Sequence, residues 1–240
     1  MIKLTFIVFA IALSSSVSAG ETLKFITIDV APWASNSPDG KSVQGVFPEV
    51  IDELEQRTGF EIVVTLTPFA RIQRELESSR QDCTILASNS ELQRITDQGE
   101  IVSTHAMGVI ARKGIKLESR EDLSKLTISV LRGSDIAADV NERLVLKKEF
   151  DTNYLIGLRK LSHMRLDAIF GALPTIRHLA DQENLSKYLG DSLVLEEIPL
   201  LLQCSKKSSK LALMPALNKA IRQMHEDGTL DEIKKEFFFE

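Results

Sequence analysis

The chain has 240 residues, with 29 Lys or Arg and 34 Asp or Glu, which gives a formal net charge of −5 at pH 7. This mild acidity, without a basic run, argues against a nucleic-acid partner. The length suits one large domain or two small lobes, and no stretch beyond the N-terminal segment is apolar enough to cross a membrane.

Residues 1–19 have the features of a cleaved export signal. Lys3 supplies a positive start, Leu4–Leu13 is an uncharged apolar run, and Val17-Ser18-Ala19 is a small-residue cleavage site. We therefore expect cleavage after Ala19 and an exported, soluble product. An uncleaved membrane anchor is the alternative, but the apolar run is shorter than the ~20 residues that span a bilayer.

The chain contains two cysteines, Cys83 and Cys204. In an oxidising compartment this even number predicts one disulfide, and each cysteine lies in or beside an apolar, strand-like run. Two buried free thiols are the alternative. The sequence has no Cys-x-x-Cys spacing and no cluster of His and Cys, so we expect no metal and no cofactor.

The first expected strand, Leu23–Asp29, leads into Trp33, the only tryptophan. An aromatic ring after a strand and a proline is typical of a pocket rim, although a place in the core or in a hydrophobic lid fits as well. Helix and strand patterns then alternate. They predict a helix over 45–59, a strand over 61–66, a helix through Phe69, Ile72 and Leu76, and a strand over 82–86.

This β-α-β-α-β order is the pattern of a parallel sheet with crossover helices. Ligands collect beyond the carboxyl ends of such strands. We therefore expect three segments to meet at one edge of the sheet and form a ligand site. They are Asp29–Trp33, Pro68–Arg71 and Ala87–Arg94.

The last of these segments has the groups that bind a carboxylate. Ser88 and Asn89 offer a hydroxyl and an amide at a helix start, and Arg94 follows about one helical turn later. An ordinary strand–turn–helix with a solvated arginine is the alternative. Arg71 is either a second cation of the site or a surface residue.

An extended run over 100–112 is expected to carry the chain out of this first unit. A second, smaller β-α-β unit follows. The patterns predict a strand over 127–131, a helix from Arg132 to about Phe150, a helix over 155–164, a strand over 167–170 and a helix over 174–181. Arg132-Gly133-Ser134 at a helix start is a candidate anion nest, although such turns are frequent. Extended runs at 193–195 and 200–203 give a second crossing, and apolar stripes predict two final helices.

Several short motifs carry a resemblance that covers essentially the whole exported chain. They are Gly45–Glu49 before a helix, the Asp82 strand with its polar turn and Arg94, Leu123 with Ile128–Val130 and Gly133-Ser134, Leu161 with Arg165–Ile169, and Leu217–Ala220 with Asp227–Leu230 and Ile233. In order and spacing the chain resembles the bacterial extracellular solute-binding proteins of family 3. These are periplasmic receptors of ABC importers for polar amino acids.

The resemblance implies an α/β fold of two lobes, each a mainly parallel sheet flanked by helices, joined by two hinge crossings. The expected ranges are 20–108 for the first part of lobe 1, 109–196 for lobe 2 and 197–240 for the second part of lobe 1. It further implies a periplasmic monomer that closes around a small molecule and then contacts an ABC permease of the inner membrane transiently.

The resemblance also assigns roles to site residues. Arg94 matches the arginine that grips a ligand carboxylate, and Asn89 stands where a threonine is usual. Gly133 and Ser134 match the second-lobe loop that donates N–H groups to the same carboxylate.

Three further positions bear on the ligand. Asp29 matches an acidic ligand contact, and Trp33 matches an aromatic residue that lines the cleft. Members that bind α-amino acids hold the ammonium group with an aspartate that follows the second-lobe strand, but Phe170–Leu173 has no carboxylate. A buried ammonium without a partner costs several kcal/mol, so a standard α-amino acid is in doubt unless Asp29 substitutes. An organic acid, a modified amino acid or a small peptide-like compound stays open.

The leading hypothesis is therefore a binding protein without chemistry that closes by a hinge motion. The second hypothesis is an enzyme on the same scaffold, of dehydratase or lyase type. Its candidate acids and bases are Asp29, Glu91 and His105, but no nucleophile elbow or metal spacing supports it. A third hypothesis, a periplasmic partner of a receptor kinase, fits the same sequence features.

Overall fold

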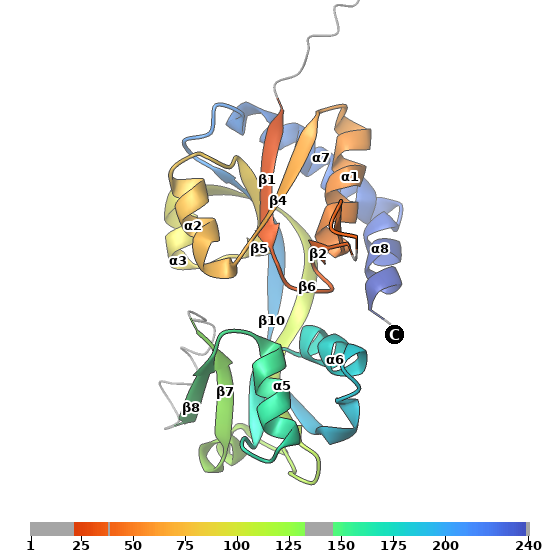
Figure 1. The fold of residues 1–240 in the computed structure, drawn as a ribbon. Helices are drawn as coiled ribbons and strands as arrows, with labels where there is room; N and C mark the ends of the chain where they lie inside the picture. The colour runs from red at the N-terminus through yellow and green to blue at the C-terminus, as the bar shows by residue number, and fades with distance from the viewer. Residues whose placement is uncertain (1–21, 38, 133–145, 239–240) are drawn as a thin grey trace, which may run out of the picture.

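The computed structural model describes residues 22–37, 39–132 and 146–238. The chain forms two lobes (Figure 1), and one mixed sheet of eight strands runs through both in the order β4-β1-β5-β10-β6-β9-β7-β8. This confirms the predicted two-lobed α/β architecture. The expected export signal, Gly133, Ser134 and most of the helix expected from Arg132 lie outside the described residues.

The first lobe is built on parallel strands that helices connect, as the sequence predicts. β1 (Leu23–Ile28) lies between β4 (Ile62–Thr67) and β5 (Cys83–Ala87). The other elements of this lobe are α1 (Val46–Thr58), α2 (Phe69–Glu77), α3 (Ser90–Ile95), α7 (Met214–Glu226), α8 (Thr229–Phe237), and the short strands β2 (Ser35–Asn36) and β3 (Val43–Gln44). α1 ends at Gly59, whose φ of 71° is in the left-handed region that favours glycine.

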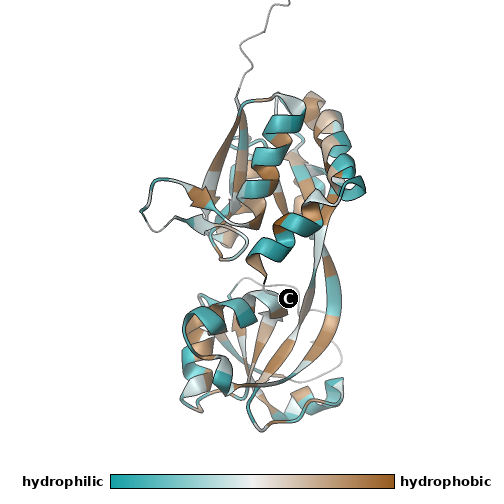
Figure 2. Cartoon of the chain, turned by 90° about the vertical axis from the view of Figure 1, so that its right-hand side faces the viewer, coloured by the Kyte–Doolittle hydropathy of each residue, from teal (hydrophilic) through white to brown (hydrophobic). Residues whose placement is uncertain are grey.

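Two long antiparallel strands join the lobes. β6 (Thr96–Arg112) and β10 (Leu189–Ser205) have 17 residues each and are paired along their whole length. The sequence predicts two short extended runs, whereas the structure has the single strand β10. The polar stretch around Glu197 still pairs with β6, although the register is irregular there. The apolar residues of these strands are visible in Figure 2 as brown segments between the lobes.

The second lobe continues the sheet with β9 (Ala168–Ala172), β7 (Thr127–Leu131) and β8 (Lys147–Asp151). The sequence predicted that a helix continues to about Phe150, and this is wrong for its last residues. Lys147–Asp151 forms the strand β8, which pairs in parallel with β7. The remaining elements of this lobe are α5 (Tyr154–Ser162), α6 (Leu173–Gln182), and the 3₁₀ helices η1 (Arg120–Lys125) and η2 (Ser186–Tyr188). A third 3₁₀ helix, η3 (Leu211–Leu213), leads into α7 of the first lobe.

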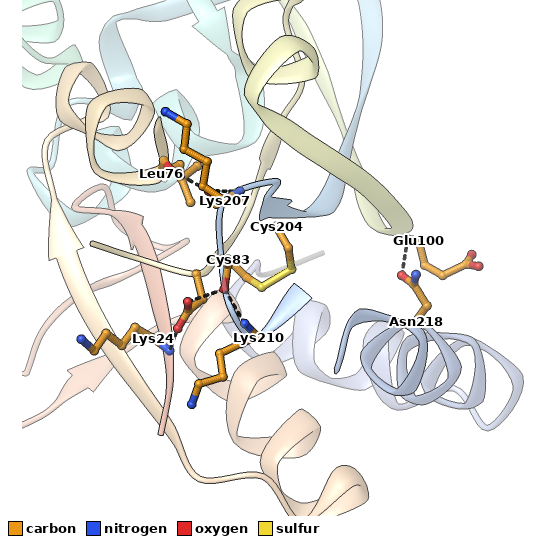
Figure 3. The surroundings of a disulfide bond; sticks show 11 residues. Lys24, Leu76, Cys83, Glu100, Cys204, Lys207, Lys210 and Asn218 are labelled. Atoms are coloured by element: carbon orange, nitrogen blue, oxygen red, sulfur yellow. Dashed lines mark hydrogen bonds between the residues drawn. A yellow bond between two sulfur atoms is a disulfide. The ribbon is translucent and has the colours of Figure 1, made fainter. Parts of the chain in front are cut away.

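The predicted disulfide joins Cys83 on β5 to Cys204 on β10 (Figure 3). The two residues lie opposite each other in the antiparallel pair, and each is at most 2% exposed. The alternative of two free thiols is therefore excluded. A second link nearby is the Glu100 N–H, which donates to Asn218 Oδ1 at 2.8 Å and ties β6 to α7.

Separate apolar cores stabilise the two lobes. Phe25, Leu54 and Ile221 belong to the core of the first lobe, and Val109 and Ile128 to that of the second. Within the described ranges, no helix is long and apolar enough to cross a membrane. The same ranges contain no group of three or more His, Cys, Asp or Glu side chains arranged to hold a metal ion.

Candidate functional site

The carboxyl ends of the first-lobe strands meet at one edge of the sheet, as the sequence predicts. Ile28 of β1 is paired with Thr67 of β4, and the Asp29 N–H donates to the Thr67 carbonyl at 3.0 Å. β5 lies parallel to β1 on its other side. Because all three strands run in the same direction, Asp29, Pro68–Arg71 and Ser88 follow them at this edge.

This edge faces the second lobe. Trp33, which follows β1, donates its indole N–H to Oγ1 of Thr175 on α6 at 2.8 Å. In the second lobe β9 ends at Ala172, just before α6, and β7 runs parallel beside it to Leu131. Arg132 therefore lies at the edge of the second half-sheet that faces the first lobe. The strand ends of the two lobes approach each other across the space between them.

Ser88 and Asn89 join β5 to α3 at this edge. Asn89 caps the helix, because its Oδ1 accepts a hydrogen bond from the Leu92 N–H at 2.8 Å. This leaves the side-chain NH₂ of Asn89 as a donor. Ser88 Oγ is buried and has no hydrogen-bond partner among the described residues. Because a buried hydroxyl without a partner is costly, Ser88 marks a point where a ligand atom or a water would complete the bonding.

The three predicted arginines lie in different surroundings. Arg71, in the first turn of α2, and Arg132 are exposed, and neither forms an ion pair within the part of the chain that the structure describes. Arg94 Nη2 lies 3.2 Å from Glu91 Oε2 and 3.2 Å from Glu77 Oε1, and its side chain is 58% exposed. The hydrogen bond to Glu91 and, with a smaller effect, that to Glu77 raise the pKa of Arg94. Glu77 is the last residue of α2, so Arg94 is bonded at the end of that helix opposite to Pro68–Arg71, and not at the sheet edge where the sequence placed it. A ligand carboxylate at Arg94 would have to replace one of these partners.

Trp33 lies in the core of the first lobe and contacts the second. Its side chain is 2% exposed, and its ring centroid lies 5.1 Å from that of Phe47, 5.0 Å from Phe238 and 5.5 Å from His105. The sequence left a pocket rim, the core and a hydrophobic lid open for Trp33, and the structure places it in the core. The hydrogen bond to Thr175 spans 142 positions in the chain, and no sequence pattern pointed to it.

The second-lobe segment in which amino-acid receptors place an aspartate is apolar and closely packed. Ala172 is buried, and its N–H donates to the Tyr154 hydroxyl at 3.1 Å. A Cβ on Gly171 would lie only 2.3 Å from Tyr154 side-chain atoms, so the phenol occupies this space. Burial raises the pKa of Tyr154 to about 12, so the group is neutral near pH 7. The segment thus presents no negative charge to a ligand.

The candidate acids and bases do not gather at one point. Asp29 lies at the sheet edge, whereas Glu91 is bonded to Arg94 on α3. His105, on β6, packs against Trp33. Burial, with a smaller contribution from a neighbouring lysine, lowers the pKa of His105 to about 4. What the sheet edges bring together is therefore a set of hydrogen-bonding and cationic groups suited to holding a small polar molecule.

Comparison with known proteins identifies this arrangement. Residues 25–240 match the bacterial extracellular solute-binding proteins, family 3. The chain belongs to this family. A curated relative of similar length, the arginine-binding extracellular protein ArtP of Bacillus subtilis (strain 168), is 23% identical over 245 residues, which cover 98% of this chain and 94% of ArtP.

Solved structures share the family fold. A histidine kinase sensor domain with similarity to periplasmic binding proteins has a TM-score of 0.79 at 14% identity, covering 92% of this chain and 97% of its own. The ancestral amino acid-binding protein AncCDT-1, a precursor of cyclohexadienyl dehydratase, has a TM-score of 0.74 at 20% identity, covering 90% and 95%. At these identities the structures show the fold, and the family match shows a solute-binding protein.

Proposed function

We propose that this family member is a periplasmic receptor that captures a small, carboxylate-bearing solute between its lobes for an ABC importer. The observation that carries the proposal is the meeting of strand ends across the interlobe space. Asp29, Arg71 and the unpartnered hydroxyl of Ser88 lie on the edge of one lobe, and Arg132 lies on the facing edge of the other.

The charges at these edges favour an anionic group in the ligand. Arg71 and Arg132 belong to different lobes and lack carboxylate partners in the described chain, so a ligand carboxylate would gain charge-assisted hydrogen bonds from both sides. In this proposal Asn89 and Arg94 complete the grip from the first lobe, and Gly133 and Ser134 complete it from the second.

The apolar segment at Phe170–Leu173 limits the ligand further. ArtP is named for binding arginine, which supports a compound related to amino acids. Because this segment offers no carboxylate, an α-ammonium group would depend on Asp29. The proposed ligands are therefore organic acids, modified amino acids and small peptide-like compounds.

The proposed mode of action is hinge closure. β6 and β10 are the two connections, and residues 20–108 and 197–240 would move as one lobe against 109–196. Closure removes water from the ligand and strengthens its electrostatic contacts. The closed monomer then presents the surface that an inner-membrane permease recognises, after export directed by residues 1–19.

The test is a thermal-shift screen of amino acids, dicarboxylates and short peptides on the exported chain. A ligand present at 100 times its Kd adds about 2.7 kcal/mol to the free energy of unfolding. With the compound that gives the largest shift, we expect Arg94→Ala to lower affinity at least about tenfold, because a charge-assisted contact is lost. The unliganded melting temperature should stay close to that of the wild type.

Arg80→Ala is the matched control. Arg80 is also exposed and bonded to a glutamate of α2, but it is not one of the predicted ligand-binding residues. Affinity should not change in this variant. Equal affinity of Arg94→Ala and the wild type would remove Arg94 from the site, and no stabilisation by any carboxylate would contradict the proposed ligand class. Conversion of the bound compound would instead favour the enzyme hypothesis.

A further inference from the structure

One short part of the connection between the lobes is only two strands wide (Figure 1). β5 pairs with residues 200–204 of β10, and β9 pairs with residues 107–111 of β6. Between these stretches, residues 104–106 of β6 and 197–199 of β10 pair only with each other among the described strands. We call this segment the ribbon. Because two strands alone have fewer backbone hydrogen bonds than the sheets on either side, the ribbon is the part of the connection that bends most easily.

A shift in strand register bounds the ribbon at each end. On the second-lobe side β10 has the extra residue Leu195, and on the first-lobe side β6 has the extra residue Val102. Extra residues of this kind bend a strand locally. The Leu195 carbonyl accepts a hydrogen bond from Arg120 Nη2 of η1 at 2.8 Å, and Val102 is buried in the core of the first lobe. Both irregularities are therefore fixed within their own lobes, and the ribbon between them is the segment left to move.

The two ends of the ribbon strand in β6 belong to different lobes. The Thr104 carbonyl accepts a hydrogen bond from Lys234 Nζ of α8 at 3.3 Å, whereas Ala106 packs against an apolar cluster of the second lobe. His105 lies between them and pairs with Ile198 in the middle of the ribbon. Its two ring nitrogens have no hydrogen-bond partner among the described residues, so no side-chain bond ties His105 to either lobe. A change in the direction of β6 therefore falls at His105.

Trp33 contacts the ribbon at this residue and reaches the second lobe. Its ring centroid lies 5.5 Å from that of His105, and its indole N–H donates to Thr175 Oγ1 in the first turn of α6 at 2.8 Å. Trp33 and Thr175 are each at most 2% exposed. Because a buried N–H without a partner is costly, a lobe rotation that keeps this bond is favoured over one that breaks it. Separations close to a centre of rotation change least, so a contact beside the bending residue is well placed to be kept.

We propose that Trp33 and Thr175 form the pivot of the hinge. The lobes bend at His105, and the hydrogen bond between Trp33 and Thr175 is kept with or without a bound solute. Trp33 is therefore a positioning residue for closure, whereas the family resemblance placed it in the lining of the cleft. The inference rests on the hinge closure of the proposed function, but not on which solute binds.

The first test uses the emission of Trp33, the only tryptophan of the chain, and needs no variant. In the exported chain without a solute, acrylamide should quench this emission only weakly, because the pivot keeps the indole buried. The quenching constant should stay the same when the compound that gives the largest thermal shift is added. Strong quenching that is lost on binding would show that the contact forms only on closure, and would overturn the pivot.

The second test measures the distance between the lobes by pulsed electron paramagnetic resonance, with spin labels at the ends of α2 and α5 and without a solute. Thr175→Val should broaden the distance distribution, because the pivot has lost its acceptor, and Thr175→Ser should keep the wild-type width. Thr96→Val is the matched control. Thr96 is also buried, but its hydroxyl donates to the Leu92 carbonyl within the first lobe, so the width should not change. An unchanged width in Thr175→Val, or equal broadening in Thr175→Ser, would overturn the proposal.

These results separate the pivot from the proposed function. The quenching of the unliganded chain and the widths of the Thr175 variants decide the pivot even where the thermal-shift screen finds no carboxylate. An empty screen contradicts the proposed ligand class alone. An exposed indole in the unliganded chain contradicts the pivot alone, since a solute could still be captured by lobes that bend elsewhere.

Discussion

At the scale of single residues, the contact that most defines the space between the lobes is the hydrogen bond from Trp33 to Thr175. The indole is almost completely buried, and its N–H has the Thr175 hydroxyl as acceptor at 2.8 Å. This one bond joins α6 to the core of the first lobe.

Thr175→Val tests the importance of this bond. Valine keeps the shape of threonine but removes the acceptor, so the indole N–H is left buried without a partner, at a cost of about 1 to 3 kcal/mol. We expect a loss of that size in the free energy of unfolding from urea titration, together with a change in Trp33 emission. Thr175→Ser, which keeps the hydroxyl, should lose much less. Equal stability of the valine and serine variants would contradict the role of the bond.

Part of the candidate site could be predicted from the sequence, because strand ends and helix starts have local patterns. Asn89 does cap a helix at the sheet edge. The contacts of Trp33 with Thr175 and of Arg94 with Glu77 depend on helices packed from distant parts of the chain, for which the sequence has no periodic pattern. Whether Arg94 reaches a ligand stays a prediction.

At the scale of elements, the central pair of strands holds the first lobe together. β10 lies between β5 and β6 in the sheet, so the chain returns from the second lobe into the middle of the first. The Cys83–Cys204 disulfide fixes β10 to β5 at the outer end of their pairing. It closes a loop that contains the whole second lobe.

Removing this disulfide should destabilise the protein strongly. The two cysteines are separated by 121 positions, and a loop of that size corresponds to about 4 to 5 kcal/mol in the chain-entropy description. We expect the Cys83→Ala and Cys204→Ala double variant to unfold at clearly lower urea concentration than the wild type. Dithiothreitol should destabilise the wild type similarly and leave the double variant unaffected. Sensitivity of the double variant to dithiothreitol would contradict this interpretation.

The same scale shows why one expected helix ended too late. Lys147–Asp151 contains mostly charged residues, and neither alternation nor β-branched side chains indicate a strand. Pairing with β7 decides its conformation, and the Ser129 hydroxyl donates to the buried carboxylate of Asp151 at 2.6 Å. By contrast, α1 and the parallel strands of the first lobe were predicted correctly, because the glycines and apolar periodicity that define them are local.

At the scale of the whole molecule, the structure combines separate apolar clusters in each lobe with one continuous sheet. Only β6 and β10 connect the two half-sheets, so bending of these strands can move one lobe against the other without breaking either core. The strand ends of both lobes border the same interlobe space. The central claim of the proposed function is that a solute bound there brings the lobes closer together.

The most direct test is a distance between the lobes measured by pulsed electron paramagnetic resonance. Spin labels are attached to cysteines introduced at Ser78, at the end of α2, and at His163, at the end of α5, with the native disulfide intact. Distances are recorded with and without the compound that gives the largest thermal shift. We predict a shorter and narrower distance distribution with the compound bound. An unchanged distribution at saturation would contradict capture by hinge closure.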